Sequence, residues 1–232
     1  MKENTLDKLL FDQKQKQDVA LVTLFHNGSQ CLVYPDSLTG DLALSVVQLK
    51  QVRSLLSTGT SKTIGEDKNR MFIRSYVSPF RLILIGAVHI AQALVPMARA
   101  VGFEITVIDP RASFCQQGRF DCVKLIHGWP DDILPTLELD QHTAIVTLSH
   151  DPKIDDPALR VALKSNALYI GSLGSSRTHE KRKDRLTECG FSKEINRIHS
   201  PVGLSLGGRE HSEIAVSILA EIIQVRHEGL KP

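Results

Sequence analysis

The sequence lacks the features that mark several broad classes of protein. Its 28 basic and 26 acidic residues give a net charge of only +2. Because the two signs are interleaved, no basic surface for nucleic acid is predicted. No stretch approaches the roughly 20 apolar residues of a membrane span, and the polar start has no apolar signal core. We therefore expect a cytoplasmic protein with no nucleic-acid and no membrane partner.

Cysteine is scarce and scattered, and several catalytic motifs are missing. The four cysteines, Cys31, Cys115, Cys122 and Cys189, form no C-x-x-C pair. This argues against a cysteine-based zinc or iron–sulfur site and favours reduced thiols. The chain also has no G-x-S-x-G elbow, no Walker A loop and no metalloprotease helix. No complete catalytic set and no metal site is predicted.

The strongest positive signal lies in residues 81–111, which read as strand, turn, helix and strand. Leu82 to Ile85 is a continuous apolar run, as expected of a strand buried on both faces. From Ile90 the apolar residues follow helical spacing, and Gly102 suits the helix end. A second strand ends at Asp109. The pattern predicts the opening βαβ unit of a Rossmann-like sheet.

The turn of this unit departs from the dinucleotide fingerprint G-x-G-x-x-G/A at one position. Gly86 and Ala91 fill the first and third places, but Val88 replaces the middle glycine, which lets a pyrophosphate approach the backbone. A β-branched side chain there should obstruct NAD in its ordinary pose. Asp109 has two open roles, which are hydrogen bonding to a ribose hydroxyl and pairing with Arg111 to shape the next loop.

Residues 1–78 predict a small α+β domain. Residues 1–17 are expected to be a helix or a frayed lead-in, and a helix is expected over residues 42–56. Apolar runs predict strands over residues 19–25, 31–34 and 70–77. Residues 35–40 and 57–69 are expected to be loops. A domain of this size is marginal alone, so we expect it to pack on the rest of the chain or on a second copy.

Residues 79–232 predict the larger, Rossmann-like domain, because strands and helices alternate along them. One helix is expected to begin with Asp156 as N-cap and Pro157 as its first residue. The last helix is expected over residues 212–226 with an apolar stripe. That helix and the small first domain together suggest a homodimer.

Polar residues and glycines follow each predicted parallel strand. Ligands of open α/β sheets bind beyond the carboxyl ends of the strands, so these turns form the predicted site. The candidate cofactor-binding residues are Gly86, Ala87, His89, Asp109, Arg111, Ser149, His150, Asp151, Gly171, Gly174, Ser175, Ser176, Arg177, Pro201 and Gly203. The alternative is that they form only the polar loops that any sheet carries.

Residues 171–177 (GSLGSSR) are the best candidate anion site in this set. Two glycines free the backbone, Ser175 and Ser176 offer hydroxyls, and the next helix starts there with exposed N–H groups. Arg177 can add positive charge. The alternative is an ordinary capped turn.

Other polar residues leave their roles open. His150-Asp151 could be a general acid–base pair or a turn before Pro152. Cys115 could handle sulfur or be a bystander thiol. His127 and His199 lie at neighbouring strand ends, but two histidines are too few ligands to predict a metal.

Four segments in order resemble the XdhC/CoxI family of accessory proteins for molybdenum hydroxylases. They are LILIGAVHIAQAL with VIDPR, TLSHDPKIDDPAL, YIGSLGSSRTHEKR, and RIHSPVGLSLGGREHSEIAVSILAEI. The resemblance covers about residues 80–226. It implies a Rossmann-like C-terminal domain preceded by a smaller domain. Residues that match the family pattern include most of the candidate set and Glu213. The Cys/Gly/Ser segment expected near the start of the family is not visible.

The resemblance also implies a function. It implies binding of the molybdenum cofactor (molybdopterin) and its delivery, after sulfuration, to a molybdenum hydroxylase apo-enzyme such as xanthine dehydrogenase or carbon monoxide dehydrogenase. A cysteine desulfurase is a further expected partner. The protein is then a non-catalytic chaperone. The competing hypotheses are an NAD(P)-dependent oxidoreductase and a nucleotide-binding regulatory module.

Overall fold

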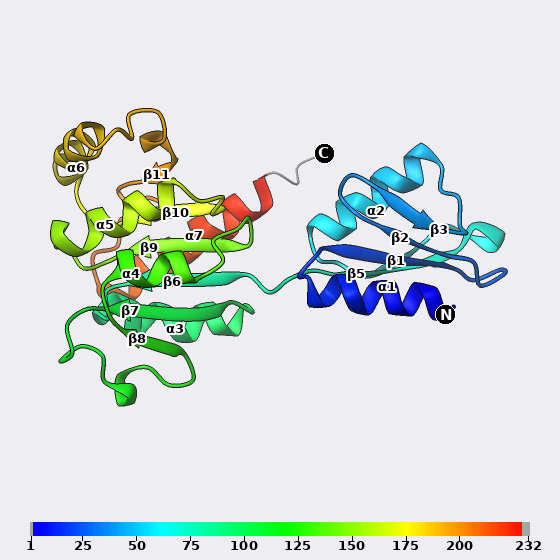
Figure 1. The fold of residues 1–232 in the computed structure, drawn as a ribbon, viewed down its shortest axis with the longest axis horizontal. Coiled ribbons are helices and arrows are strands. Elements are labelled where there is room, and N and C mark those ends of the chain that lie inside the picture. The colour runs from blue at the N-terminus through cyan, green and yellow to red at the C-terminus, as the bar shows by residue number, and fades with distance from the viewer. Residues whose placement is uncertain (1, 229–232) are drawn as a thin grey trace. The chain divides into compact units, whose positions relative to one another are not determined.

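The computed structural model describes residues 2–228 (Figure 1). Residues 229–232, at the end of the predicted second domain, lie outside the described residues. The chain divides into two compact units between Ser78 and Pro79. No helix in the described part of the chain combines the length and apolar character needed to cross a bilayer.

The first unit is an antiparallel sheet in the order β3-β2-β1-β5-β4. The strands are β1 (Val19–Leu24), β2 (Gln30–Val33), β3 (Leu38–Gly40), β4 (Lys62–Ile64) and β5 (Met71–Tyr76). Helix α1 (Glu3–Lys14) packs Leu9 against one face, and α2 (Val46–Ser57) packs Val52 and Leu56 against the other.

Three details of this unit differ from the sequence prediction. The expected loops at residues 35–40 and 57–69 contain the edge strands β3 and β4. Both have three residues and bury none of them, so no apolar pattern marks them. Helix α2 begins at Val46 rather than residue 42, because Ser45 and Gln48 form a capping box.

The second unit is a six-stranded parallel sheet in the order β11-β10-β9-β6-β7-β8. The strands are β6 (Arg81–Ile85), β7 (Glu104–Asp109), β8 (Lys124–His127), β9 (Thr143–Thr147), β10 (Tyr169–Ser172) and β11 (Ile198–His199). This is the strand order of the doubly wound dinucleotide-binding folds. The predicted α/β class, a Rossmann-like parallel sheet after a small α+β unit, is confirmed.

Helices cover both faces of this sheet (Figure 1). They are α3 (His89–Ala100), α4 (Pro130–Ile133), α5 (Pro152–Leu163), α6 (Ser176–Glu188) and α7 (His211–Glu228). In β6, Leu82 and Leu84 join the cluster under α3 and α7, whereas Ile83 and Ile85 join the cluster under α5. This alternation of buried faces explains the unbroken apolar run. Short 3₁₀ turns of this unit are η2 (Gln117–Arg119), η3 (Leu134–Thr136) and η4 (Ile195–Arg197), and the first unit has η1 (Asp67–Asn69).

The predicted start of α5 at Asp156 is wrong. The helix begins at Pro152, because Asp151 is the N-cap and accepts a hydrogen bond from the Lys153 N–H over 2.9 Å. An acidic residue before proline occurs twice in this segment, and the first occurrence starts the helix. Pro157 therefore lies inside the helix, and Asp155 enters its first turn.

Candidate functional site

The carboxyl ends of the parallel strands meet at one edge of the second unit. The strand order reverses between β6 and β9, and ligands of open α/β sheets bind beside such a reversal. The turns after β6, β7, β9, β10 and β11 all leave the sheet at this edge. The predicted site residues lie in these turns, at the strand ends before them, or in the first turn of the helix that follows, as His89, Ser176 and Arg177 do.

The turn after β6 touches the turn after β9. Gly86 has a φ of +110°, and a Cβ there would lie 3.0 Å from the backbone nitrogen of Ser149. Only glycine allows both this conformation and this contact. The next residue, Ala87, donates its backbone N–H to Asp109 Oδ2 over 2.8 Å, so this donor points into the protein rather than toward a ligand.

The start of α3 carries Val88 and His89. Val88 is the helix N-cap, and its partly buried side chain packs against the apolar cluster beneath α3 and α7. His89 is exposed and stacks on His211 at the start of α7, with ring centroids 5.3 Å apart. The starts of these two helices therefore lie side by side.

Asp109 ends β7 as a fully buried carboxylate. It accepts hydrogen bonds from Ala87 N, Arg111 N, Arg111 Nε and Arg111 Nη2 over 2.7 to 2.9 Å. Burial alone would raise the pKa of Asp109, but these donors outweigh it and hold the pKa below its usual value. Of the two predicted roles, the structure has the pairing with Arg111.

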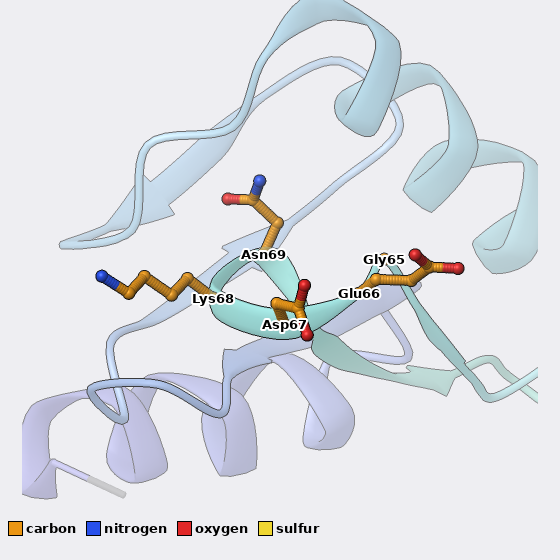
Figure 2. Close-up of a pocket in the computed structure, with 5 residues that line it drawn as sticks. All are labelled: Gly65, Glu66, Asp67, Lys68 and Asn69. Atoms are coloured by element: carbon orange, nitrogen blue, oxygen red, sulfur yellow. The ribbon is translucent and has the colours of Figure 1, made fainter.

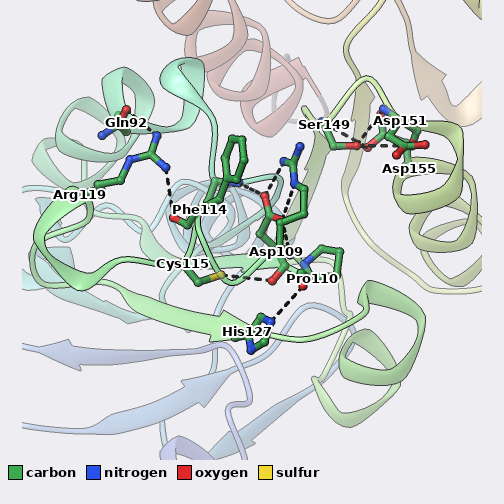
Figure 3. A network of polar contacts seen from close by, with 12 residues as sticks. Gln92, Asp109, Pro110, Phe114, Cys115, Arg119, His127, Ser149, Asp151 and Asp155 are labelled. Atoms are coloured by element: carbon green, nitrogen blue, oxygen red, sulfur yellow. Dashed lines mark hydrogen bonds and ion pairs between the residues drawn. The ribbon is translucent and has the colours of Figure 1, made fainter.

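The loop after β7 gathers two arginines around one ring. The Arg111 Cζ lies 3.9 Å from the Phe114 ring centroid, and the Arg119 Cζ lies 5.6 Å from it. Arg119 donates through Nη1 to the Phe114 carbonyl and through Nη2 to Gln92 Oε1. Figure 3 shows these two hydrogen bonds of Arg119 in the same view as Asp109.

Cys115 and His127 anchor the same loop. Cys115 Sγ donates to the Asp109 carbonyl over 3.2 Å, and His127 Nε2 lies 3.0 Å from the Pro110 carbonyl oxygen (Figure 3). Burial raises the pKa of the Cys115 thiol, and the Asp109 carboxylate adds to this effect. Since the thiolate is the reactive form, this environment favours the bystander alternative.

The turn after β9 is held by its own hydrogen bonds. Ser149 Oγ accepts from the Asp151 N–H over 3.1 Å, while the Asp151 carboxylate caps α5. His150 adopts a left-handed φ of +62°, and burial lowers its pKa, with the positive charge of Arg182 adding to the shift. These contacts favour the turn over the predicted acid–base pair.

Asp155, which sequence reasoning missed, lies behind this turn. It is 1% exposed and accepts from Ser149 Oγ over 2.6 Å (Figure 3). Its Oδ2 is buried without a hydrogen-bond partner among the described residues. Burial raises the pKa of Asp155 to about 6 because the Ser149 bonds and the charge of Arg182 offset it only in part.

Arg182, from α6, joins the turns after β10 and β11. This guanidinium is 2% exposed and donates through Nη2 to the Leu173 carbonyl and through Nη1 to Ser200 Oγ. Within the described residues its Nε is buried and unpartnered. Burial lowers the pKa of Arg182 even though Asp155 and Asp156 pull it upward.

The serine-rich turn after β10 is exposed at Ser175, Ser176 and Arg177. The Ser175 hydroxyl caps α6 by accepting from the Thr178 N–H over 3.2 Å. The first N–H groups of a helix have no acceptor within the helix. The turn therefore combines the predicted capped geometry with an accessible helix start that can bind an anion.

The turn after β11 is fixed by Glu221 of α7. Its carboxylate accepts from the Gly203 N–H over 2.7 Å, lies 3.0 Å from His199 Nδ1, and accepts from the Tyr169 hydroxyl. Gly203 has a φ of +94°, and a Cβ there would lie 2.0 Å from Ser217 Oγ. The turn, which contains a cis Ser200–Pro201 bond, thus lies tight against α7.

A pocket of about 640 Å³ opens between the turns after β10 and β11 and the start of α7. Gly174, Pro201 and Gly203 of the predicted set line it, together with the glycine-rich residues 205–208. The structure therefore brings these residues to one cavity. Asp109 and Arg111 lie at the other side of the strand reversal, beyond β6 and β9.

A second hollow, of about 980 Å³, belongs to the first unit. Figure 2 shows that one short turn, residues 65–69, supplies all its labelled lining residues. Every one of these residues is exposed. A hollow formed by a single exposed turn offers a ligand no enclosing walls, so we assign no site to it.

Asp155, Arg182 and Glu221 could not be identified from their spacing alone. They lie inside helices, whereas the candidates were sought in turns. For Asp155 and Glu221 the available signal was a charged residue among the apolar residues of a helix, since charged residues are rarely buried unpaired. Helix α6 is charged throughout, so its sequence carries no such signal for Arg182. The expectation that His127 and His199 lie at neighbouring strand ends is wrong, because they end β8 and β11, the two opposite edge strands of the six-stranded sheet. In the described part of the chain no three potential ligands among His, Cys, Asp and Glu come together as a metal site, and the four cysteines are free.

Comparisons with known proteins agree with this architecture. Residues 82–222 match the model of the XdhC Rossmann domain. A crystal structure of a xanthine dehydrogenase from Bacillus halodurans shares the fold with a TM-score of 0.69 at 24% identity, covering 96% of this chain and 63% of that chain.

Two curated relatives are similar in sequence. A protein of Bacillus subtilis (strain 168), named as a probable xanthine dehydrogenase component, is 33% identical over 162 residues, which are 69% of this chain and 47% of the relative. The molybdenum cofactor insertion chaperone PaoD of Escherichia coli (strain K12) is 30% identical over 179 residues, 76% of this chain and 49% of PaoD. The chain spans about half the length of these relatives. Because the family model matches more than half of the chain, the protein belongs to the family defined by the XdhC Rossmann domain.

Proposed function

We propose that the protein binds the molybdenum cofactor and helps to insert it into the apo-form of a molybdenum hydroxylase, of the xanthine dehydrogenase or carbon monoxide dehydrogenase type. The name of the relative PaoD supports this role. The single observation that supports it best is the pocket between the turns after β10 and β11, which lies beside the exposed start of α6.

In this proposal the pocket takes the ring system of a phosphorylated pterin, and the neighbouring start of α6 takes its phosphate. The terminal phosphate of the cofactor would bind the first N–H groups of α6 with the hydroxyl of Ser176 and the charge of Arg177. Gly174, Pro201 and Gly203 leave space for the ring system.

Retention of molybdopterin by the purified full chain tests this proposal. We expect binding at micromolar concentration, and weaker binding when Ser176→Ala and Arg177→Ala are combined, because these two side chains are the proposed phosphate contacts and Ser175 still caps α6. Arg99→Gln, an exposed arginine near the end of α3, is the matched control and should bind as the wild type does. Absence of retention would contradict the cofactor role, and unchanged affinity in the double variant would exclude the α6 start.

Two partner proposals accompany this function. A cysteine desulfurase would sulfurate the bound cofactor, and co-purification of the two proteins with cofactor present tests this. A homodimer would enlarge the binding surface, and light scattering at working concentration tests it. A monomer would contradict the second proposal and leave the first untouched.

A nucleotide is the second candidate ligand. The strand order of the second unit is that of the dinucleotide-binding folds, although Val88 stands in the phosphate turn. If Val88 only obstructs a pyrophosphate, Val88→Gly should increase the affinity for NAD or NADP. No binding by either form would set an oxidoreductase or a dinucleotide sensor aside.

A further inference from the structure

The loop after β7 carries two arginines beside one phenylalanine ring, and none of these residues lines the pocket beside α6. We propose that Arg111, Phe114 and Arg119 form a phosphate-monoester site, whose ligand is the 2′-phosphate of an adenosine nucleotide of the NADP type. This inference sharpens the second candidate ligand above and does not depend on cofactor binding.

The orientation of Arg111 leaves one edge of its guanidinium open. Asp109 occupies the side edge, formed by Nε and Nη2, with bonds of 2.9 and 2.7 Å. A guanidinium has five N–H donors in a rigid fork. Within residues 2–228 the end edge, Nη1 with the second hydrogen of Nη2, has no hydrogen-bond acceptor and is available to an anion. Such two-point contacts match the geometry of phosphate oxygens.

The same guanidinium is fixed before any ligand arrives. Phe114 supports one face at 3.9 Å, and the side chain keeps 34% of its surface exposed. The backbone of the loop is anchored by Cys115 and His127. Because little conformational freedom is lost on binding, a preorganised group contributes more of its interaction energy to affinity. The outer face of the guanidinium can stack against adenine.

Arg119 supplies a second positive charge beside the same ring. Its guanidinium lies 5.6 Å from the Phe114 centroid and is held by the Phe114 carbonyl and Gln92. Two arginines held at one loop suit a phosphate monoester, which carries two negative charges, better than they suit an uncharged ribose hydroxyl. Arg111 stays charged there, because the hydrogen bond to Asp109 raises its pKa, and the charges of Asp109, Asp151 and Asp155 add to the effect.

The position of this loop indicates which part of a nucleotide it would bind. In a Rossmann unit the end of the second strand lies beside the adenosine ribose. Asp109 cannot accept a ribose hydroxyl there, because it is fully buried and already accepts four donors. An arginine at this place accommodates a ribose 2′-phosphate in dinucleotide enzymes. The pairing of Asp109 with Arg111 therefore favours the phosphorylated ribose over the free one.

Calorimetric titration of the full chain with adenosine 2′,5′-bisphosphate and with 5′-AMP tests this site. Both probes lack a pyrophosphate, so Val88 does not obstruct them. We expect the bisphosphate to bind about tenfold or more tightly than 5′-AMP. Arg111→Lys keeps a charge beside Asp109 but removes the fork, and it should abolish most of this preference. Arg119→Gln, which removes the second charge and leaves the Asp109 pair intact, should reduce it, and Arg99→Gln should leave it unchanged.

Three outcomes would overturn the inference. They are equal affinity for the two nucleotides in the wild type, a preference that survives in both Arg111→Lys and Arg119→Gln, and inorganic phosphate binding as tightly as the bisphosphate. The fluorescence of Trp129, the single tryptophan, confirms that each variant is folded. Retention of molybdopterin is measured separately, so failure of one proposal is distinguishable from failure of the other.

Discussion

Two buried aspartates at the same edge of the sheet have opposite ionisation behaviour. Asp109 is 0% exposed and Asp155 is 1% exposed. The donors of Arg111 and Ala87 overcome burial and lower the pKa of Asp109, whereas burial dominates at Asp155 and raises its pKa to about 6. The number of donors that reach a carboxylate, rather than the depth of burial, decides its charge.

Arg111 and Arg182, the arginines whose charges act on these two aspartates, also have pKa shifts in opposite directions. The bond to Asp109 raises the pKa of Arg111, while burial lowers that of Arg182, whose contacts are to a carbonyl and a hydroxyl. At the end of β7 the charges of Asp109 and Arg111 are therefore paired with each other and held in place. Among the described residues, the side at β9 to β11 holds charged groups with unpartnered atoms at Asp155 and Arg182. Of the two arrangements, the second can change its ionisation near neutral pH.

Removing the β7 carboxylate should have the largest effect. Asp109→Ala takes four hydrogen bonds from Ala87 and Arg111, and we expect a loss of about 3 kcal/mol in the free energy of unfolding. Urea denaturation followed by Trp129 fluorescence measures it. Asp121→Ala, an exposed aspartate of the same loop, should change stability by less than about 0.5 kcal/mol. Equal effects would remove the distinction between paired and exposed charges.

The pH dependence of stability should separate the two aspartates. The pKa of Asp155 rises from 3.8 to about 6 on folding. The stabilising contribution of its protonated form to folding is therefore fully present below pH 4 and is lost as the pH rises through 6. Between pH 4 and pH 7, the free energy of unfolding of Asp155→Asn should therefore increase by about 2–3 kcal/mol relative to that of the wild type. Asp109, with a lowered pKa, contributes in the opposite sense, above its unfolded pKa. Urea denaturation at several pH values measures this, and a difference in unfolding free energy between wild type and Asp155→Asn that stays constant from pH 4 to pH 7 would contradict it.

Thiol reactivity should reveal the environment of the β7 loop. Burial and the Asp109 carboxylate raise the pKa of Cys115, while Cys122 and Cys189 are exposed. At pH 8 we expect iodoacetamide to modify Cys115 about tenfold more slowly than these two. Peptide mass spectrometry of timed samples measures the rates. Faster modification of Cys115 would reopen the sulfur-handling role.

The smallest effect is expected at the serine turn. Ser175→Ala removes the N-cap of α6 and should lower the free energy of unfolding by about 1 kcal/mol. Ser175→Asn should restore most of it, because asparagine caps helices well. If alanine and asparagine are equally stable, the hydroxyl is free for ligand binding and does not cap the helix.

Most of the framework of the second unit could be predicted from the sequence. The run Leu82–Ile85, the spacing from Ile90 and the end of β7 at Asp109 are local patterns that agree with the final fold. The edge strands β3 and β4 could not be predicted, because backbone pairing creates them without apolar side chains. The start of α5 was misplaced because two acidic–proline steps compete within a few residues.

The sequence by itself determined the parallel sheet, the common edge at which its turns meet, and the helix start after β10, since each depends on short-range pattern and on the direction of the strands. Only the tertiary structure decided which charges are satisfied. It closed Asp109 onto Arg111, and it buried Asp155 and Arg182 with an unpartnered atom on each among the described residues. Hydrogen-bond partners and burial arise from contacts between residues distant along the chain, so no local pattern encodes them.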